Sequence, residues 1–457
     1  MKKKVPVAKG EEIETDIVDL AYGGDSIAKY GDFTIFLPYG VPGARVCAKI
    51  LDVKKNFATG RITKVIKQSQ IYENPQCPYF GECGGCDWMN VRYKNQVEYK
   101  KKIITDMVSR IAGINNVFIR QPIIYENPFY YRNRAQYKIK YENKKIKIGF
   151  FRARSHEVIA IDKCMILNDK INEIADVIEN SLNEDHRGFS LYSEENKKGY
   201  LRYITVKVNS RDESLVTFVV TDRDRKKFMD NVSANLIKRI EKLKGIVLNL
   251  NRDEGNAVFG KKDISLYGKP FITESFSDID FLLGSASFFQ INFFIYEKMA
   301  DYVNKNVSSG VNLLDLYGGV GALTVPLKDK VRQICVIDNE RSNIDKLRNL
   351  CSRDGIKNVF PVCANAEDVV EKILYEKKID EVVVDPPRKG LHPVVLFALK
   401  NSGVRNIIYV SCNPSTFARD VKELKEKYYL KEIIPLDQFA HTYHVELMAK
   451  LERKVKN

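Results

Sequence analysis

The chain has 457 residues, which is enough for two or three domains of ordinary size. Hydrophobic residues make up 44% and charged residues 29%, and no apolar run approaches the ~18 residues that cross a bilayer, so we expect no membrane partner. The net charge of +15 instead favours a polyanionic partner, most simply nucleic acid.

The first residues, Met1-Lys-Lys-Lys-Val-Pro6, are basic but lack the apolar stretch of a signal peptide, which predicts a cytoplasmic protein. Nine cysteines in such a protein argue against a disulfide framework. They favour metal-binding, redox or catalytic roles for some of the thiols.

Residues 1–68 have the pattern of a small β-barrel of the oligonucleotide-binding type. Short alternating segments over 11–20, 26–37, 44–53 and 57–66 are separated by glycine-containing turns. Lysines and arginines along these segments can give the barrel a basic face, although a solvated lysine-rich surface explains each of them equally well.

Residues 69–285 are predicted to form a mixed α and β domain. A polar helical pattern covers 93–111 and can pack on the domain that follows, and strand-like runs cover 134–141, 145–151, 200–208 and 214–221.

Three cysteines lie close together in this central segment, at Cys77, Cys83 and Cys86. Gly84 and Gly85 allow tight turns between them, so the three thiols can converge on one metal centre. Cys164 is the natural fourth ligand. Four cysteines suit a structural zinc ion and a cubane iron–sulfur cluster equally well, and the spacing does not choose between them.

Residues 286–457 alternate between strand and helix patterns, which predicts a parallel, doubly wound α/β sheet covered on both faces. Helical patterns cover 341–353 and 417–427. The strands are expected over residues 311–316, 333–338, 359–363, 381–384, 406–410 and 444–451.

A glycine-rich turn follows the first of these strands, in Asp315-Leu-Tyr-Gly-Gly-Val-Gly321. Glycines let the backbone approach a ligand closely, and no Gly-Lys-Ser/Thr follows, so the turn is not a P-loop. Asp338 ends the second strand, 20 residues after Gly318 in the sequence. At this sequence separation an acidic side chain can reach the ribose hydroxyls of the ligand. The pattern predicts a nucleotide-like cofactor.

Two further motifs lie at the ends of later strands. Asp385-Pro-Pro-Arg-Lys-Gly390 resembles the loop of enzymes that methylate exocyclic amines, but Arg388 stands where those enzymes place an aromatic residue. Cys412, in Ser411-Cys-Asn-Pro414, ends the fifth strand beside a turn, where a thiol can point into a cleft. The sequence therefore offers a cofactor turn and a candidate nucleophile on one sheet.

These motifs, together with Phe288-Phe-Gln-Ile-Asn292 and His441-Thr-Tyr-His-Val-Glu446, resemble in order those of the S-adenosylmethionine-dependent RNA 5-methyluridine methyltransferases. Residues 1–68 resemble the RNA-binding TRAM domain that many members carry. The departures are Gly318 where cysteine is common, Asp338 where glutamate is usual, and Ala440 where proline is usual.

The resemblance implies a mechanism of covalent catalysis. Cys412 looks like the nucleophile that adds to C6 of uracil, and Glu446 looks like the base that removes the C5 proton. His441 and His444 are expected to be structural. The cofactor, S-adenosyl-L-methionine, is expected to contact residues of the glycine turn and its neighbours: Gln290, Tyr317, Gly318, Gly319, Gly321, Asp338 and Asp385.

The same resemblance implies a [4Fe-4S] cluster on Cys77, Cys83, Cys86 and Cys164. Because bacterial tRNA relatives usually lack both the TRAM domain and these cysteines, it favours 23S rRNA as the substrate. A tRNA enzyme remains the first alternative. An RNA cytosine-5 methyltransferase is disfavoured because the Asp385 motif lacks a cysteine, and a non-catalytic RNA-binding assembly factor because Cys412 and Glu446 are present. No obligate protein partner is predicted.

Overall fold

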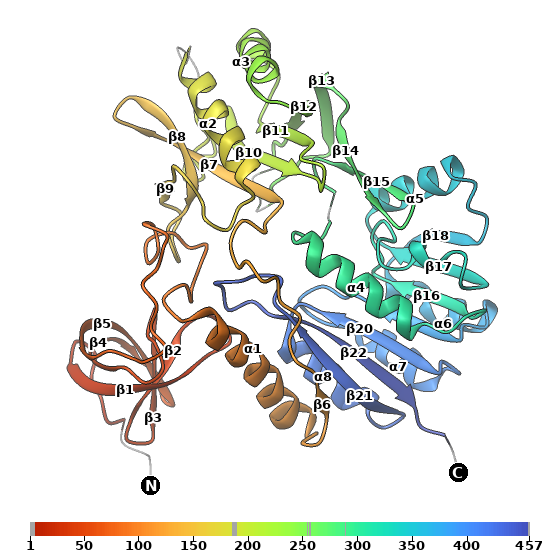
Figure 1. Cartoon of the computed structure of the whole chain (residues 1–457), viewed down its shortest axis with the longest axis horizontal. Helices are drawn as coiled ribbons and strands as arrows, with labels where there is room; N and C mark the ends of the chain where they lie inside the picture. Colours follow the sequence, from red (N-terminus) through yellow and green to blue (C-terminus); the bar gives the residue numbers. More distant parts are fainter. Residues whose placement is uncertain (1–4, 185–189, 254, 256, 288, 456–457) are drawn as a thin grey trace.

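The described residues form three large sheets, a small barrel, a central sheet and a C-terminal sheet, and a separate two-stranded hairpin (Figure 1). The computed structural model describes residues 5–184, 190–253, 255, 257–287 and 289–455. Phe288, the first residue of one sequence motif, lies outside the described residues. No helix in the described part of the chain has the length and apolar character needed to cross a membrane.

The first sheet is a closed five-stranded barrel with the order β1-β2-β3-β5-β4, and β1 also pairs with β4. Alternate side chains such as Val46 and Ala48 are fully buried inside it, as the period of two along the sequence predicts. The run expected over 26–37 is a hairpin of two strands that turn at Gly31, whose φ is 58°. The strands are β1 Glu12–Leu20, β2 Ser26–Tyr30, β3 Phe33–Leu37, β4 Arg45–Val53 and β5 Phe57–Lys67.

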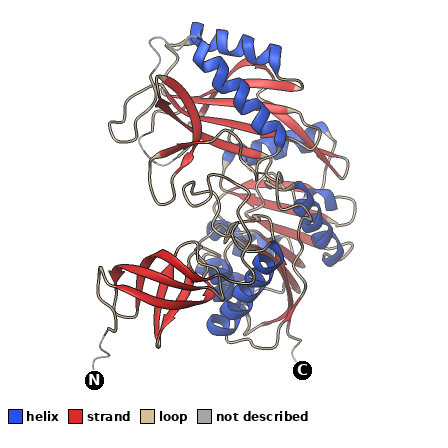
Figure 2. Ribbon diagram, turned by 60° about the vertical axis from the view of Figure 1, so that its left-hand side comes forward, coloured by secondary structure: helices blue, strands red, loops and turns tan. Residues whose placement is uncertain are grey.

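The central sheet has seven strands in the order β13-β12-β11-β10-β7-β8-β9, and helices α2 (Asp169–Glu184) and α3 (Lys226–Arg239) pack against it (Figure 2). A separate hairpin, β14 (Phe271–Phe276) and β15 (Ile279–Gly284), leads from it to the last domain. The seven strands are β7 Arg134–Glu142, β8 Lys145–Phe151, β9 Val158–Ala160, β10 Leu201–Val208, β11 Ser214–Val220, β12 Leu243–Leu250 and β13 Lys262–Gly268.

The C-terminal sheet has eight strands in the order β18-β17-β16-β19-β20-β22-β21-β6. Every residue of β16 is buried, as expected for a strand covered on both faces, and this includes the polar Asn312 and Asp315. The strands are β16 Asn312–Leu316, β17 Gln333–Asp338, β18 Val359–Cys363, β19 Glu381–Val384, β20 Asn406–Ser411, β21 Tyr428–Leu436, β22 Glu446–Arg453 and the short β6 Phe118–Ile119.

Helices cover both faces of this sheet. On one face α4 and α5 pack with the strands in one apolar core, and on the other α1, α6, α7 and α8 form a second core. Short π-helical and 3-10 turns, η1 (Val108–Ala112) and η2 (Val325–Leu327), complete the fold. The helices are α1 Tyr93–Met107, α4 Phe293–Asn306, α5 Arg341–Arg353, α6 Ala366–Glu376, α7 Pro393–Asn401 and α8 Pro414–Leu424.

The sheet differs from the all-parallel arrangement that the sequence predicts. Strand β22 runs antiparallel to both β20 and β21. Only nine residues join β21 to β22, too few for the helical crossover that parallel neighbours need. Strand β21 was not predicted, and Pro435 within it is the reason, because proline is uncommon in a strand paired on both sides.

Helix α1 ties the segment before the central sheet to the C-terminal sheet (Figure 1). The Lys100 ammonium donates hydrogen bonds to Asp437 Oδ1 at 2.6 Å and to the Phe439 carbonyl at 2.9 Å, and both charged side chains are 1% exposed. Gln96 accepts the His441 N–H at 3.0 Å. These bonds fix the loop of residues 437–445, which leads into β22.

The buried ion pair predicts a large effect of truncating Lys100. Lys100→Ala should lower the free energy of unfolding by about 3–5 kcal/mol, because Asp437 is left charged, buried and without its partner. Lys102→Ala is the matched control, since Lys102 is about half exposed and pairs with Asp19 and Asp106 at the surface. It should cost less than about 1 kcal/mol. Urea denaturation of both variants measures the difference, and equal losses would contradict this assignment.

Candidate active site

The glycine turn after β16 folds tightly around one carboxylate. Tyr317 and Gly319 have positive φ values of 63° and 59°. A Cβ atom on Gly318 would lie 2.6 Å from the Asp315 carboxyl carbon and 2.7 Å from Val336 Cγ1, so no larger side chain fits there without rearrangement.

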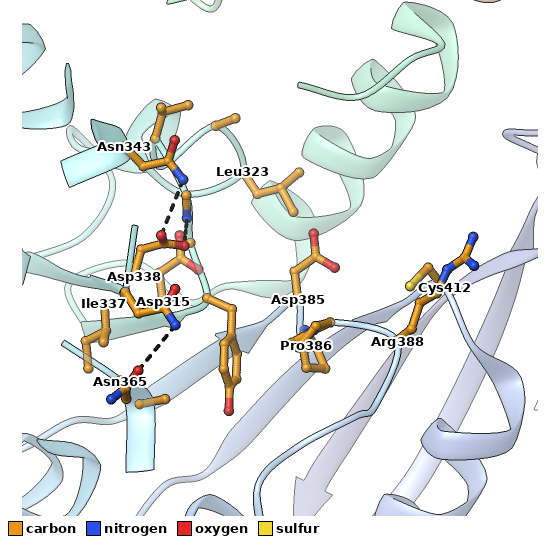
Figure 3. Close-up of a pocket in the computed structure, with 18 of the residues that line it drawn as sticks. Asp315, Leu323, Ile337, Asp338, Asn343, Asn365, Asp385, Pro386, Arg388 and Cys412 are labelled. Carbon is orange, nitrogen blue, oxygen red and sulfur yellow. Dashed lines mark hydrogen bonds between the residues drawn. The ribbon is translucent and has the colours of Figure 1, made fainter. Parts of the chain in front are cut away.

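Asp338 holds this turn against the next strand. Its carboxylate accepts the Gly319 N–H at 3.0 Å and the Asn343 side-chain amide at 3.3 Å (Figure 3). It also accepts the Glu340 N–H at 2.9 Å. The end of β17 and the start of α5 are thus joined to the glycine turn. Asp338 is half-buried and faces the cavity described below.

Two more carboxyl groups lie deeper. Asp315 accepts a hydrogen bond from the Thr324 hydroxyl at 2.5 Å, and burial together with the charges of Asp385 and Asp338 raises its pKa to about 7. Burial raises the pKa of Asp385, which ends β19, to about 7 as well. Uncompensated carboxyl groups of this kind favour a cationic ligand, because a positive charge would restore their ionised form.

The candidate nucleophile and base face each other across two strands. Ser411 of β20 pairs with Leu447 of β22, so the antiparallel register carries Cys412 opposite Glu446. Asn413 caps α8 by accepting the Ser415 N–H at 3.1 Å, which fixes the turn after Cys412. Glu446 is 7% exposed, and its Oε2 is buried without a hydrogen-bond partner among the described residues.

Burial dominates the electrostatics of this pair. It raises the pKa of Glu446 to about 8, with a further contribution from Asp385, while Arg388 acts in the opposite direction. Burial also raises the pKa of Cys412 to about 11, Glu446 and Asp385 raise it further, and Arg388 lowers it. A neutral thiol and a largely protonated carboxyl group therefore face each other at neutral pH, and Arg388 is the cation that favours the thiolate.

One cavity of about 670 Å³ joins these groups. Asp338 and Asn343 lie at one end, Cys412 and Arg388 at the other, and Asp385 between them (Figure 3). Every residue that the sequence proposes for the cofactor or the chemistry lines this cavity except Gly321: Gln290, Tyr317, Gly318, Gly319, Asp338, Asp385, Cys412 and Glu446. Gly321 has a φ of 77° and packs on Val325, so it shapes the turn from behind.

Gln290 reaches the cavity from the segment that joins β15 to α4. Its side chain accepts a hydrogen bond from Gln438, and its carbonyl accepts one from Asn133 at 3.0 Å. The cavity also has lining residues that the sequence analysis missed, among them Asn343 and Asn365. Asn365 follows β18, so extending the search to the end of every strand would have found it.

Both histidines of the last motif are held by their surroundings. His441 is buried, its Nδ1 lies 3.2 Å from Gln96 Nε2, and its ring stacks on Phe129 at 4.6 Å. Burial lowers the pKa of His441 and of His444 to about 4, so both rings are neutral near pH 7. Neither of these two histidines lines the cavity, whereas Cys412 and Glu446 both do.

The four central cysteines surround a second cavity, of about 270 Å³. Cys77, Cys83, Cys86 and Cys164 all line it, together with apolar side chains. In the described part of the chain, no three His, Cys, Asp or Glu side chains lie close enough together to hold a single metal ion. Burial raises the pKa of Cys83 to about 11.

Known proteins are similar to this chain in sequence over most of its length. The model of the tRNA (Uracil-5-)-methyltransferase family matches residues 92–454, and that of the TRAM domain matches residues 6–63. An uncharacterized RNA methyltransferase of Clostridium acetobutylicum is 32% identical, covering 99% of both chains, and one of Caldanaerobacter subterraneus is 31% identical, covering 97% of this chain and 98% of the other.

A solved structure is similar over nearly the whole chain. It is the tRNA (uracil-54, C5)-methyltransferase of Pyrococcus abyssi in complex with S-adenosyl-L-homocysteine. The TM-score is 0.75 and the identity 27%, over 96% of this chain and 99% of that one.

The opposed charges around Cys412 predict opposite effects on its reactivity. At pH 8.5, Glu446→Gln removes a partly charged carboxylate, lowers the pKa of Cys412 and should speed its alkylation by iodoacetamide by roughly three- to tenfold. Arg388→Ala removes the cation that stabilises the Cys412 thiolate and should slow the alkylation. Mass spectrometry of the Cys412 peptide over time gives both rates, with Cys47 of the barrel as the internal control. Unchanged or slower labelling in Glu446→Gln would contradict this electrostatic coupling between the two groups.

Proposed function

This chain belongs to the family of the tRNA (uracil-5-)-methyltransferases, and on that premise we propose which residues perform the reaction and which RNA receives the methyl group. It is an S-adenosylmethionine-dependent RNA methyltransferase that acts on C5 of uracil. The observation that carries the proposal is the cavity in which Cys412, Glu446 and the glycine turn of β16 meet.

The cavity suits the cofactor in volume and in charge. S-adenosylmethionine supplies, when bound, an electrophilic methyl group on a positively charged sulfonium. The carboxyl groups of Asp315, Asp338 and Asp385 provide the negative surroundings that such a cation needs, and the glycine turn allows its backbone to approach the ligand. Gln290, Tyr317, Gly318 and Gly319 are the remaining proposed contacts, and Gly321 supports the turn.

Cys412 is the proposed nucleophile. Its thiolate adds to C6 of uracil, and the electrons of the C5=C6 bond move to C5, which becomes nucleophilic enough to accept a methyl group. Arg388 helps to form the thiolate, because it is the cation that lowers the pKa of Cys412. The uridine has to leave its stack to present C6 to this thiol.

Glu446 is the proposed general base. After methylation, C5 carries both the methyl group and a proton, and the Glu446 carboxylate takes that proton as the C5=C6 bond re-forms and the bond from sulfur to C6 breaks. The unpartnered Oε2 of Glu446 is available for this proton. Its raised pKa of about 8 places the group near the operating pH, where a base both accepts and releases protons readily.

We propose that Cys77, Cys83, Cys86 and Cys164 bind a [4Fe-4S] cluster. The four thiols line one cavity of about 270 Å³, and apolar neighbours such as Ile161 and Leu167 line it with them. A zinc ion is held by four ligands at about 2.0–2.3 Å, and in the described part of the chain no three of the thiols lie close enough together to hold a single ion. The cluster would hold the cysteine loop to the central sheet, since methyl transfer itself needs no electron.

For the substrate we propose 23S rRNA, because the TRAM barrel and the four cysteines occur together in this chain. The second candidate is tRNA, and one observation favours it. The Pyrococcus abyssi enzyme, whose title names tRNA, matches 96% of this chain, so the same overall architecture also occurs in a protein named for tRNA.

Mapping of 5-methyluridine separates these two substrates. RNA from a strain lacking this chain should have lost the modification at one or more uridines of 23S rRNA and should keep its tRNA pattern. Methylation by the purified protein should restore it. Loss from tRNA alone would replace the first proposal by the second, and unchanged RNA of both kinds would contradict the proposed function.

Variants of the two catalytic residues should fail in different ways. Cys412→Ala should abolish turnover and keep cofactor binding, because it removes only the attacking thiol. Glu446→Gln leaves addition and methylation possible but blocks proton removal, so a covalent protein–RNA adduct should accumulate. Denaturing gels report the adduct. Its formation by Cys412→Ala, or normal turnover by that variant, would rule out this mechanism.

The cluster proposal predicts colour and composition. Purified under anaerobic conditions, the protein should be brown, with about four iron and four sulfide per chain, as a cubane requires. Serine at Cys77, Cys83, Cys86 or Cys164 should each lower the iron content, whereas Cys47→Ser in the barrel should not. A colourless protein with one zinc ion per chain would overturn the assignment.

A further inference from the structure

A second, open groove lies beside the active-site cavity, and the mechanism above does not use it. It has a volume of about 800 Å³, large enough for a nucleotide-sized ligand. Four parts of the chain form it: the barrel at Gly23–Asp25 and Tyr39, the cysteine loop up to Asp87, the turn after β8, and Tyr443.

The groove combines aromatic rings with cationic side chains. Tyr39, Phe151 and Tyr443 supply rings, and Arg152, Arg154 and His156 supply the planar cationic or polar groups. Single-stranded RNA is bound by such surfaces, since every base can stack on an aromatic ring or a guanidinium.

The charges in the groove suit a base better than a phosphate. Arg154 donates to Asp25 at 2.6 Å, and Arg152 binds Glu157 at 2.7 Å and lies 3.5 Å from Glu82. Both guanidinium groups are therefore already neutralised. The Asp25 and Asp87 carboxylates that also line the groove repel phosphate but can accept hydrogen bonds from the amino or imino groups of a base.

The backbone of the groove is strained at two large residues. Tyr39 has a φ of 59° and Arg154 a φ of 58°, in the left-handed region that residues other than glycine, asparagine and aspartate rarely adopt. Strained positions that persist in a fold gather at binding sites. Gly24 is needed for close packing here, because a Cβ atom on it would lie 2.8 Å from Asp87 Oδ1 and 3.2 Å from the Tyr443 ring.

Tyr443 connects the groove to the nucleophile. Its ring meets that of Tyr22 edge to face at 5.6 Å and lies 4.1 Å from that of His444. The Tyr22 hydroxyl, which comes from the barrel, is 3.5 Å from the carbonyl oxygen of Cys412. Contacts through Tyr443 and Tyr22 therefore link the groove to the backbone of the nucleophile.

We propose that this groove is a subsite for a second unstacked nucleobase of the substrate RNA, adjacent in sequence to the uridine that enters the active site. The base stacks on the rings of the groove, and its hydrogen-bond donors face the Asp25 and Asp87 carboxylates. The inference rests on the proposed function, because it assigns the groove to the same RNA strand.

Two variants test the subsite while keeping its backbone. Tyr39→Asn and Arg154→Asn remove the ring and the guanidinium, and asparagine tolerates the left-handed conformation. Steady-state kinetics with total RNA from the strain lacking this chain should show a KM for RNA raised by roughly 5- to 100-fold, as expected for a lost stacking contact. S-adenosylmethionine affinity should change less than twofold, and the iron content should stay at the parent value.

Arg405→Asn is the matched control, because Arg405 is 60% exposed and paired with Asp380, as Arg154 is 66% exposed and paired with Asp25. Its KM should equal that of the parent. Unchanged KM values in both groove variants would overturn the inference. So would a clear fall in the salt dependence of RNA binding by Tyr39→Asn, since that would mark a phosphate contact.

Combining a change in the RNA with a change in the protein identifies which base occupies the groove. In a synthetic RNA that spans the mapped uridine, an abasic site at one neighbouring position should weaken binding to the parent protein and should not weaken binding to Tyr39→Asn further. Additive losses at every neighbouring position would contradict the subsite. Failure of the proposed function would be distinguishable from failure of the subsite, because the parent protein itself would then form no 5-methyluridine.

Discussion

The reversed direction of β22 is the constraint on which the active site depends. The parallel strands β16, β17, β19 and β20 all end at one edge of the sheet, and they deliver the glycine turn, Asp338, Asp385 and Cys412 there. A further parallel strand would begin at the opposite edge. Because β22 is antiparallel, its first residue, Glu446, starts at the edge where the others end, directly across from Cys412.

This geometry has an electrostatic consequence. Glu446 is buried beside the half-buried Cys412, and its charge disfavours the thiolate of Cys412. The proposed reaction needs the Cys412 thiolate first and the Glu446 carboxylate later. The two groups therefore do not have to be charged at the same time. Arg388, at the rim of the cavity, is the described cation that favours both charged forms.

The sequence predicted the parts of the fold that local pattern determines. The alternating strands of the barrel, the buried run of β16 and the positions of Asp338 and Cys412 at strand ends follow from the period of the side chains and from the rule that ligands bind at the carboxyl ends of strands. The antiparallel direction of β22 was not predicted, because strand direction depends on pairing and not on the composition of the strand, and β21 was missed because of its proline.

Other features depend on contacts between distant segments and leave no local signal. Lys100 and Asp437 are 337 residues apart and pair only after α1 packs on the sheet. The groove between Tyr39, Arg154 and Tyr443 likewise combines three segments whose individual sequences look like ordinary loops. Its best indication, the left-handed backbone of Tyr39 and Arg154, is visible only in three dimensions.

The central claim is that Cys412 forms a covalent bond to the substrate uracil. The most direct measurement is peptide mass spectrometry after incubation of the parent protein with S-adenosylmethionine and RNA that contains 5-fluorouridine, where fluorine prevents the loss of a proton from C5. If the proposed mechanism holds, a methylated fluorouridine nucleotide is attached to the Cys412 peptide. Attachment at another residue, or complete methylation with no attached nucleotide, would contradict it.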